Sequence, residues 1–182
     1  MESAKQPKYF TIDDIYNLPE GKRAELIDGE LYMMATPSTK HQIMVTELTY
    51  QINNYIKQKR GDCFVLPSPF AVFLNADNKT YVEPDISVIC DKDKLTDEGC
   101  MGAPDWIIEV VSPSSHAMDY IKKLLKYGTA GVREYWIVDL AKERITVYNF
   151  ENESAEEYTF SDKIIAGIYE DFEIDFGKIS FI

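Results

Sequence analysis

The chain has 182 residues, of which 45% are hydrophobic and 13% aromatic, and its formal net charge is −12. This length suits a single domain spanning residues 1–182 with a substantial core, and the apolar content excludes a wholly disordered chain. Nucleic-acid-binding proteins usually carry a broad basic surface, and the negative net charge argues against one here. A few locally basic stretches still allow a smaller positive surface. Those stretches contain Lys57, Lys59, Arg60, Lys122, Lys123 and Lys126.

The three cysteines, Cys63, Cys90 and Cys100, show no Cys-x-x-Cys spacing, and their number is odd. This pattern predicts a reduced, cytoplasmic protein without structural zinc. The first eight residues contain no apolar signal segment, and no stretch reaches the roughly 18 apolar residues of a membrane helix. We therefore expect neither export nor a membrane span.

The N-terminal third predicts a short helix, a hairpin and a long helix. Thr11 and the acids after it begin the short helix, and Asp28-Gly29 is a two-residue turn between apolar strands at residues 23–27 and 30–34. Ser38 caps the long helix, which runs to about Arg60 and stops at Gly61. His41 shares its inward face with the apolar positions Val45, Leu48, Ile52 and Tyr55 or Ile56.

The middle of the chain predicts strands separated by loops. Residues 63–90 read as two or three strands interrupted by Pro67, Pro69 and a turn at 75–79, and residues 91–104 read as a polar surface loop. Residues 106–112 are rich in β-branched side chains and long enough for a central strand.

The C-terminal half predicts a strand–helix–strand unit. A helix begins at Pro113-Ser-Ser and ends at Gly128 and Gly131, before a strand at 133–140. This order favours a right-handed crossover and a parallel strand pair. Residues 145–150 return as a hairpin, and the alternation at 172–176 suggests an edge strand. The class is α/β or α+β, with a mixed β-sheet flanked by helices.

Two acids stand inside apolar runs, Asp85 in residues 81–89 and Glu109 in residues 105–112. A buried carboxylate is unfavourable unless it is paired, hydrogen-bonded or bound to a cation. If the two runs are neighbouring strands, both acids meet at one place, and the main-chain carbonyl of Val110 adds a third oxygen. Such oxygens suit Mg²⁺. The alternatives are that Asp85 is a turn acid after Pro84, and that Glu109 faces outward from a sheet with one wet face.

The helix after Glu109 carries Asp119, Lys123 and Tyr127 along one stripe. From spacing alone, Asp119 and Lys123 form an exposed ion pair, and the opposite stripe of Ile121, Leu125 and Gly128 is the packing face. The other interpretation places Lys123 beside the acids, where it would offset charge developing on a phosphate.

Other chemistries find little support in the sequence. It has no Gly-x-Ser-x-Gly elbow, Gly-rich phosphate loop or His-Glu-x-x-His motif, and its two histidines do not cluster. A zinc hydrolase or a glycosidase is therefore disfavoured. We take His116 as an ordinary surface or core residue, and His41 as of more interest because it faces inward.

The order of these motifs resembles the Uma-two family of restriction-endonuclease-like proteins, a branch of the PD-(D/E)XK nuclease superfamily. The resemblance spans about residues 10–139. It rests on these segments in order: residues 25–30, Pro37-Ser38 with His41, Pro84-Asp85, residues 106–114, Asp119 with Lys123 and Tyr127, and residues 130–139.

This resemblance implies a restriction-endonuclease-like core with an N-terminal hairpin, Mg²⁺-dependent DNA cleavage in which Mn²⁺ substitutes, and a homodimer. It assigns Asp85 and Glu109 as the motif acids. The superfamily's usual lysine, two positions after the second acid, is here Val111, and Lys123 matches a lysine moved to the next helix. Glu25 and His41 also match family positions.

Two hypotheses follow. In the first, Asp85, Glu109 and the Val110 carbonyl bind Mg²⁺ and Lys123 stabilises developing charge, which makes the protein a DNA endonuclease. In the second, the nuclease fold is a binding or regulatory module without cleavage activity. Overall acidity favours the second hypothesis, and the intact acids and lysine favour the first.

Overall fold

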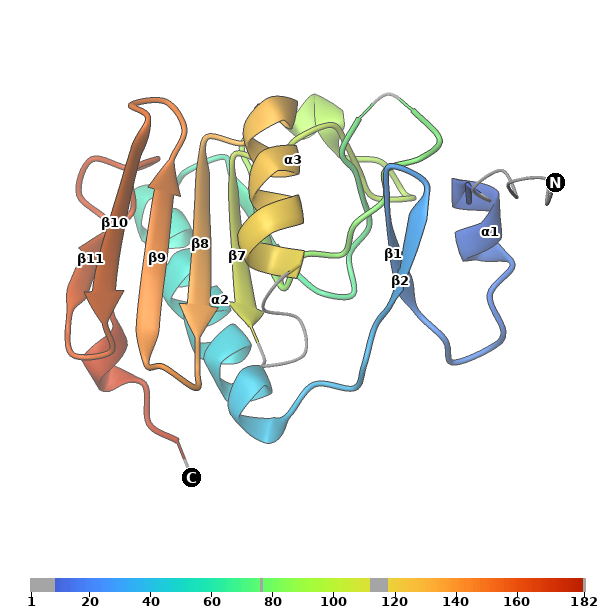
Figure 1. The fold of residues 1–182 in the computed structure, drawn as a ribbon. Helices are drawn as coiled ribbons and strands as arrows, with labels where there is room; N and C mark the ends of the chain where they lie inside the picture. The colour runs from blue at the N-terminus through green and yellow to red at the C-terminus, as the bar shows by residue number, and fades with distance from the viewer. Residues whose placement is uncertain (1–8, 76, 112–117, 182) are drawn as a thin grey trace, which may run out of the picture.

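The computed structural model describes residues 9–75, 77–111 and 118–181, and at its centre is a six-stranded mixed sheet (Figure 1). The strand order is β10 (Ser154–Thr159), β9 (Arg144–Asn149), β8 (Glu134–Asp139), β7 (Trp106–Val111), β5 (Ile86–Ile89) and β3 (Phe64–Pro67). β7 and β8 run parallel, and every other neighbouring pair is antiparallel. The mixed sheet, the parallel pair and the hairpin into β9 are as predicted.

The two central strands are buried along their whole length, and their side chains alternate between two cores. Trp106, Ile108 and Val110 point to one face, and Ile107 and Val111 point to the other. Because the side-chain period of a strand is two, Glu109 shares the face of Ile107 and Val111.

The long helix α2 (Thr39–Lys59) covers the first of these faces. Its buried residues recur at helical spacing, at Met44, Val45, Leu48, Ile52 and Ile56. The Ser38 side chain accepts a hydrogen bond from the backbone N–H of His41 (3.2 Å), which satisfies the start of the helix. Arg60 adopts a left-handed conformation (φ 55°) at the other end, so the helix stops where predicted.

The C-terminal segment completes this face beside α2. It contains β11 (Lys163–Ile165), β12 (Glu173–Asp175) and a 3₁₀ turn (Phe176–Lys178). The predicted edge strand at 172–176 is present as β12, but it pairs with β11 in a separate two-stranded sheet and not with the main sheet. Phe172, Ile174 and Phe176 pack into the hydrophobic core between α2 and the main sheet. The segment therefore covers the sheet and does not extend it.

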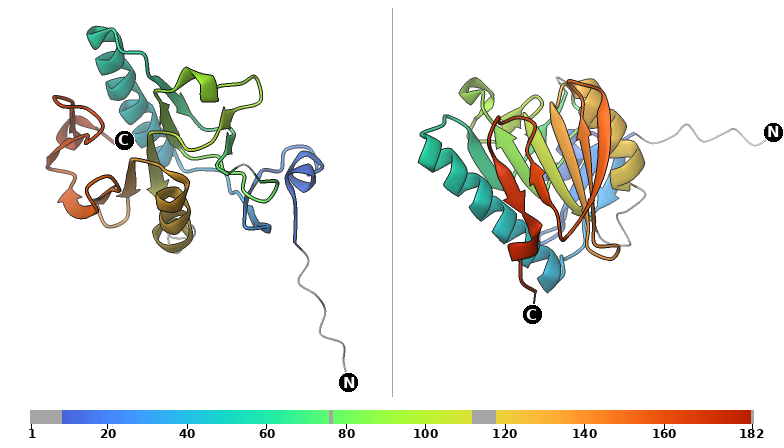
Figure 2. Two further views of the ribbon diagram at one scale, coloured as in Figure 1. Left: turned by 90° about the horizontal axis from the view of Figure 1, so that it is seen from above. Right: turned by 90° about the vertical axis from the view of Figure 1, so that its left-hand side faces the viewer.

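The second face carries a π-helical turn (Met118–Lys123) that continues into α3 (Leu124–Ala130). The right-hand view of Figure 2 shows α2 and α3 on opposite sides of the sheet. Gly131 ends α3 with a positive φ of 96°, as predicted, whereas Gly128 lies inside the helix. A Cβ atom at Gly128 would lie 2.9 Å from the Phe150 ring, so this glycine allows close packing and does not end the helix.

Residues 91–104 are more structured than the predicted surface loop. They contain a 3₁₀ turn (Lys92–Lys94) and β6 (Cys100–Met101), which pairs in parallel with β4 (Val72–Phe73). A Cβ atom at Gly99 would lie 2.4 Å from the Ala71 carbonyl oxygen, so only glycine permits this approach. Cys100 and Ala103 are buried as a result.

The N-terminal elements lie at the opposite end of the sheet from β10 (Figure 1). They are α1 (Ile12–Tyr16) and a hairpin of β1 (Ala24–Ile27) and β2 (Glu30–Met33). Asp28 and Gly29 have φ values of 53° and 78°, as the predicted two-residue turn requires. The Leu26 and Tyr81 backbones exchange two hydrogen bonds, which attach β1 to the segment before β5.

The prediction that all cysteines are reduced is wrong, because Cys63 and Cys90 form a disulfide. Phe64 pairs with Ile89 in the β3–β5 ladder, so Cys63 and Cys90 are the next residues across the two strands. Cys100 is a free thiol. Among the described residues, no helix combines the length and the apolar character needed to cross a bilayer.

Candidate active site

Asp85, the residue just before β5, lies beside Glu109 on the neighbouring strand β7. Ile86 pairs with Ile108 in the antiparallel β5–β7 ladder, so the residue before Ile86 faces the residue after Ile108. The Asp85 backbone nitrogen lies 3.5 Å from Glu109 Oε2, and Asp85 Oδ2 accepts a hydrogen bond from the Val110 N–H (2.8 Å). The N–H and C=O groups of a residue in a strand point to the same side, so the Val110 carbonyl also faces the side of Asp85.

Glu109 points toward α3, where two side chains donate hydrogen bonds to its carboxylate. Glu109 Oε1 accepts hydrogen bonds from Lys123 Nζ (2.8 Å) and from the Tyr127 hydroxyl (2.9 Å). The Glu109 side chain is only 6% exposed, so its burial depends on these partners. The alternative of an outward-facing Glu109 is wrong.

Lys123 also reaches the N-terminal hairpin. Its ammonium lies 2.8 Å from Glu25 Oε2, and Glu25 Oε1 accepts a hydrogen bond from the Glu83 backbone N–H (3.0 Å). The Lys123 side chain is 5% exposed. A lysine with so little access to water needs compensating charge, which the two glutamates provide. We call Glu25, Lys123, Glu109 and Tyr127 the acid–lysine cluster.

This arrangement is the opposite of the helix orientation indicated by spacing alone, and it places Lys123 beside an acid as in the other interpretation. Ile121 and Leu125, the expected packing face, are 62% and 66% exposed, while Lys123 and Tyr127 are buried. The interpretation of Lys123 as a member of an exposed ion pair is therefore wrong. The side chain of Asp119, and all of His116, lie outside the described residues.

His41 approaches the acid pair from the first turn of α2. Its Nε2 lies 3.1 Å from Asp85 Oδ2, and its Nδ1 lies 3.0 Å from the Gln42 side-chain oxygen. Burial alone would lower the pKa of His41, but the hydrogen bond to Asp85 and the charge of that carboxylate outweigh it and raise the pKa above its usual value. Asp85 thus favours the imidazolium form.

The five predicted residues Glu25, His41, Asp85, Glu109 and Lys123 are therefore linked by a continuous chain of contacts, in which the backbone N–H of Asp85 makes the link to Glu109. Three carboxylates face one ammonium and one imidazole, so the group stays net negative whether or not His41 is protonated. A second cation is the electrostatic complement of such a group.

A further buried glutamate, Glu83, lies next to this group and was missed by the sequence analysis. Glu83 Oε1 accepts a hydrogen bond from the Tyr81 hydroxyl (2.8 Å), and Glu83 Oε2 accepts one from Arg23 Nε (2.9 Å). Arg23 also donates to the Ser68 hydroxyl (2.8 Å). We call Arg23, Tyr81 and Glu83 the arginine cluster. The available signal was the two-residue spacing of Arg23 and Glu25, and of Glu83 and Asp85, which places each pair on one face of an extended segment.

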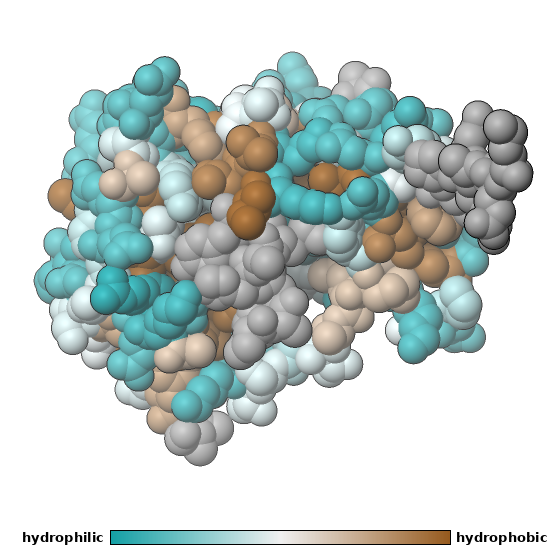
Figure 3. Space-filling model, viewed as in Figure 1, coloured by the Kyte–Doolittle hydropathy of each residue, from teal (hydrophilic) through white to brown (hydrophobic). Residues whose placement is uncertain are grey.

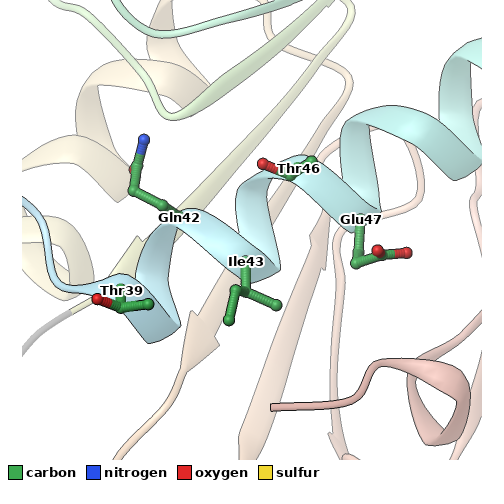
Figure 4. A pocket seen from close by; sticks show the side chains of 5 residues that line it. All are labelled: Thr39, Gln42, Ile43, Thr46 and Glu47. Atoms are coloured by element: carbon green, nitrogen blue, oxygen red, sulfur yellow. The ribbon is translucent and has the colours of Figure 1, made fainter. Parts of the chain in front are cut away.

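Two surface hollows lie near these elements without including the acid pair. One, of about 240 Å³, is formed by the first half of α2 (Figure 4), and its lining residues are Thr39, Gln42, Ile43, Thr46 and Glu47. The other, of about 360 Å³, lies between α3 and the β9–β10 hairpin. Figure 3 shows apolar residues gathered on the surface over α3, beside this hollow.

Comparison with known proteins gives three kinds of match. The sequence model of the Uma2 family, described as "Putative restriction endonuclease", matches residues 9–175. Two uncharacterised proteins of Synechocystis sp., slr1290 and sll1609, are 26% and 28% identical to the chain over 129 and 130 residues. These matches cover 70% of this chain, and they span 66% and 72% of the two relatives' lengths.

The fold also matches a solved structure. A crystal structure of a "putative nuclease belonging to DUF820" from Anabaena variabilis superimposes with a TM-score of 0.71. The match covers 87% of this chain and 90% of that protein, at 22% sequence identity. At this identity the likeness shows a shared fold.

Proposed function

The chain belongs to the Uma2 family, described as putative restriction endonucleases, and on this premise we propose that it is a metal-dependent endonuclease that hydrolyses DNA phosphodiester bonds at Asp85 and Glu109. The observation that carries this proposal is that Asp85, just before β5, lies beside Glu109 on β7, with a buried lysine bound to the Glu109 carboxylate. Family membership alone does not distinguish an active enzyme from an inactive relative.

The residues present suit a hard divalent cation such as Mg²⁺ or Mn²⁺. Among the described residues, no three His, Cys, Asp or Glu side chains converge to enclose a metal ion. The acid pair instead offers two carboxylates and, in the Val110 carbonyl, a main-chain oxygen. Mg²⁺ commonly uses one or two carboxylates and keeps several of its waters, so this small donor set fits it.

When bound, such an ion would acidify a water molecule and shield the charge of the phosphodiester. The protein's own residues would prepare the site for that chemistry. Lys123 would place a positive charge beside the acids and stabilise negative charge that develops on the phosphate. Glu25 would hold the Lys123 ammonium beside Glu109, and His41 would hold the Asp85 carboxylate in place.

A non-catalytic nuclease-fold module is the second candidate, and the surface charge favours it. Surface lysines predicted to form a positive patch are paired with acids: Lys122 with Glu30, Lys126 with Asp28 and Lys59 with Asp171. Such pairing reduces the attraction for a nucleic-acid backbone. An active nuclease would then depend on the site itself for much of its contact with DNA.

The decisive experiment compares DNA cleavage by wild type, Asp85→Ala and Glu109→Ala, purified identically and assayed with Mg²⁺ and with Mn²⁺. Glu134→Gln is a matched control, because Glu134 is a buried acid in the neighbouring strand β8 but lies on the α2 face with Trp136. We expect wild type and the control to cleave, and both alanine variants to lose cleavage.

Equal activity in all four proteins would point to a contaminant or to a different site. Wild-type protein that neither cleaves any nucleic acid nor takes up metal in a calorimetric titration would support the binding module.

A homodimer and a cytoplasmic location stay predictions. The homodimer follows from the family resemblance, and light scattering during gel filtration would test it. The disulfide between Cys63 and Cys90 removes the argument from reduced cysteines for a cytoplasmic location.

A further inference from the structure

Tyr127 contributes a hydrogen bond to the acid pair that the motif analysis did not assign. The side chain is fully buried, and its hydroxyl lies 2.9 Å from Glu109 Oε1. Its ring packs edge-on against Tyr135, with centroids 4.9 Å apart. In this hydrogen bond the phenol hydroxyl is the donor and the Glu109 carboxylate is the acceptor.

Lys123 and Tyr127 bind the same oxygen of Glu109. They stand four residues apart, one helical turn, so both side chains reach Oε1 from one side. The other oxygen, Oε2, lies toward Asp85, whose backbone nitrogen is 3.5 Å away. The terminal torsion of a glutamate is broad, so without such donors the carboxylate plane would be poorly defined.

We propose that Tyr127 is a positioning residue that holds the Glu109 carboxylate with Oε2 toward Asp85 and so pre-organises the acid pair for a divalent cation. This inference rests on the proposed function.

The two donors have different capacities to fix an orientation. Lys123 divides its ammonium between Glu109 and Glu25, and a lysine ammonium is a rotatable point charge on a flexible stem. The Tyr127 ring is held by packing, and its hydroxyl occupies one position relative to the helix. Lys123 therefore supplies charge, and Tyr127 supplies geometry.

The test measures Mn²⁺ affinity by calorimetry for wild type, Tyr127→Phe and Tyr81→Phe. Tyr81→Phe is a matched control, because Tyr81 also donates to a glutamate in the interior, at 2.8 Å from Glu83, outside the acid pair. Loss of a residue that orients a metal ligand typically weakens metal binding about 10- to 100-fold. We expect a loss of this size for Tyr127→Phe and wild-type affinity for Tyr81→Phe.

Two further variants separate positioning from packing. Replacing Tyr127 with 4-aminophenylalanine keeps a donor at the para position, whereas 4-methylphenylalanine fills the same space without one. We expect the amino form to bind Mn²⁺ nearly as well as wild type and the methyl form to bind as weakly as Tyr127→Phe. This pair also serves as the test if Tyr127→Phe does not fold.

Equal Mn²⁺ affinity in wild type and Tyr127→Phe, or in the amino and methyl forms, would overturn the inference. If wild type binds Mn²⁺ and Asp85→Ala and Glu109→Ala do not, the proposed function would stand in spite of that result. If wild type itself takes up no Mn²⁺, the proposed function fails and the inference fails with it.

Discussion

The acid–lysine cluster and the arginine cluster are two neighbouring solutions to the same physical problem. In each, a buried glutamate accepts a hydrogen bond from a tyrosine and pairs with a cation: Glu109 with Tyr127 and Lys123, and Glu83 with Tyr81 and Arg23. They differ in access to water and in excess charge. The Lys123 side chain is 5% exposed and the Arg23 side chain 40% exposed.

Counted over the described residues, the acid–lysine cluster is the one of the two with more carboxylates than cations. Glu83 and Arg23 form a balanced pair, whereas Lys123 faces both Glu25 and Glu109, with Asp85 next to them. A balanced pair needs nothing more, but a cluster with surplus carboxylates favours a further cation. This difference is why we assign metal binding to one cluster and a structural role to the other.

Lys123→Met should have the largest effect on stability. It leaves Glu25 and Glu109 buried without their cation, and removal of one partner from a buried ion pair typically costs about 3–5 kcal/mol. Denaturant unfolding would measure this loss. Lys126→Met is the control, because Lys126 pairs with Asp28 at the surface and should change stability by less than about 1 kcal/mol. Equal losses in the two variants would contradict our description of the acid–lysine cluster.

Arg23→Met should have a smaller effect and should leave cleavage unchanged. Glu83 keeps its hydrogen bond from Tyr81 and can gain water where the guanidinium was exposed, so we expect a loss of about 1–2 kcal/mol. Denaturant unfolding and the DNA cleavage assay would be run on the same preparation. Loss of cleavage in a folded Arg23→Met protein would mean that the two clusters work as one.

Glu134 extends the comparison to a buried glutamate whose hydrogen bond comes from the neutral Trp136 ring N–H. Burial raises its pKa above the usual 4.5, although the Trp136 ring N–H, the backbone N–H groups of Gly167 and Ile168, and the charge of Arg133 oppose this. The folded protein therefore binds the Glu134 proton more tightly than the unfolded chain does. The protonated carboxyl makes its full contribution to stability below about pH 4.5, the usual pKa of the unfolded chain. That contribution is lost as pH rises through the folded-state value.

Glu134→Gln should therefore unfold like wild type in acid and be more stable at neutral pH, on the order of 1 kcal/mol. Thermal unfolding across the pH range would measure the difference. Glu151→Gln provides the opposite sign, because the hydrogen bond from Arg133 lowers the pKa of Glu151. If Glu134→Gln were less stable than wild type at neutral pH, the carboxylate would have a partner that we have not recognised.

Local patterns predicted the elements of this fold well. Asp28-Gly29 specified the hairpin turn, and Ser38 and the spacing of Val45 to Ile56 are typical of the helix found. The apolar runs at 106–111 and 134–139 became the central strands. Each of these signals depends on residues close together in the chain.

The failures concern contacts between distant segments. The Cys63–Cys90 disulfide depends on β3–β5 pairing, which no spacing motif reports. The spacing of Ile121 and Leu125 did not indicate the orientation of the helix, because Lys123 is buried against Glu25 and Glu109, which are distant in the chain. The arginine cluster likewise joins residues 60 positions apart.

The candidate site was predictable in its membership but not in its geometry. Asp85, Glu109, Lys123, Glu25 and His41 were all chosen from motifs, and the structure places them in one connected group. The link from His41 to Asp85 and the sharing of Oε1 by Lys123 and Tyr127 required the packed structure.

The most direct test of the central claim is a crystal structure of the protein soaked in Mn²⁺, read by anomalous scattering. We predict an ion bound by carboxylate oxygens of Asp85 and Glu109 and by the Val110 carbonyl oxygen, at about 2.1 Å from each. Lys123 should remain in contact with Glu25. A crystal that shows no ion at the acid pair at saturating Mn²⁺, or an ion bound only elsewhere, would contradict the proposal.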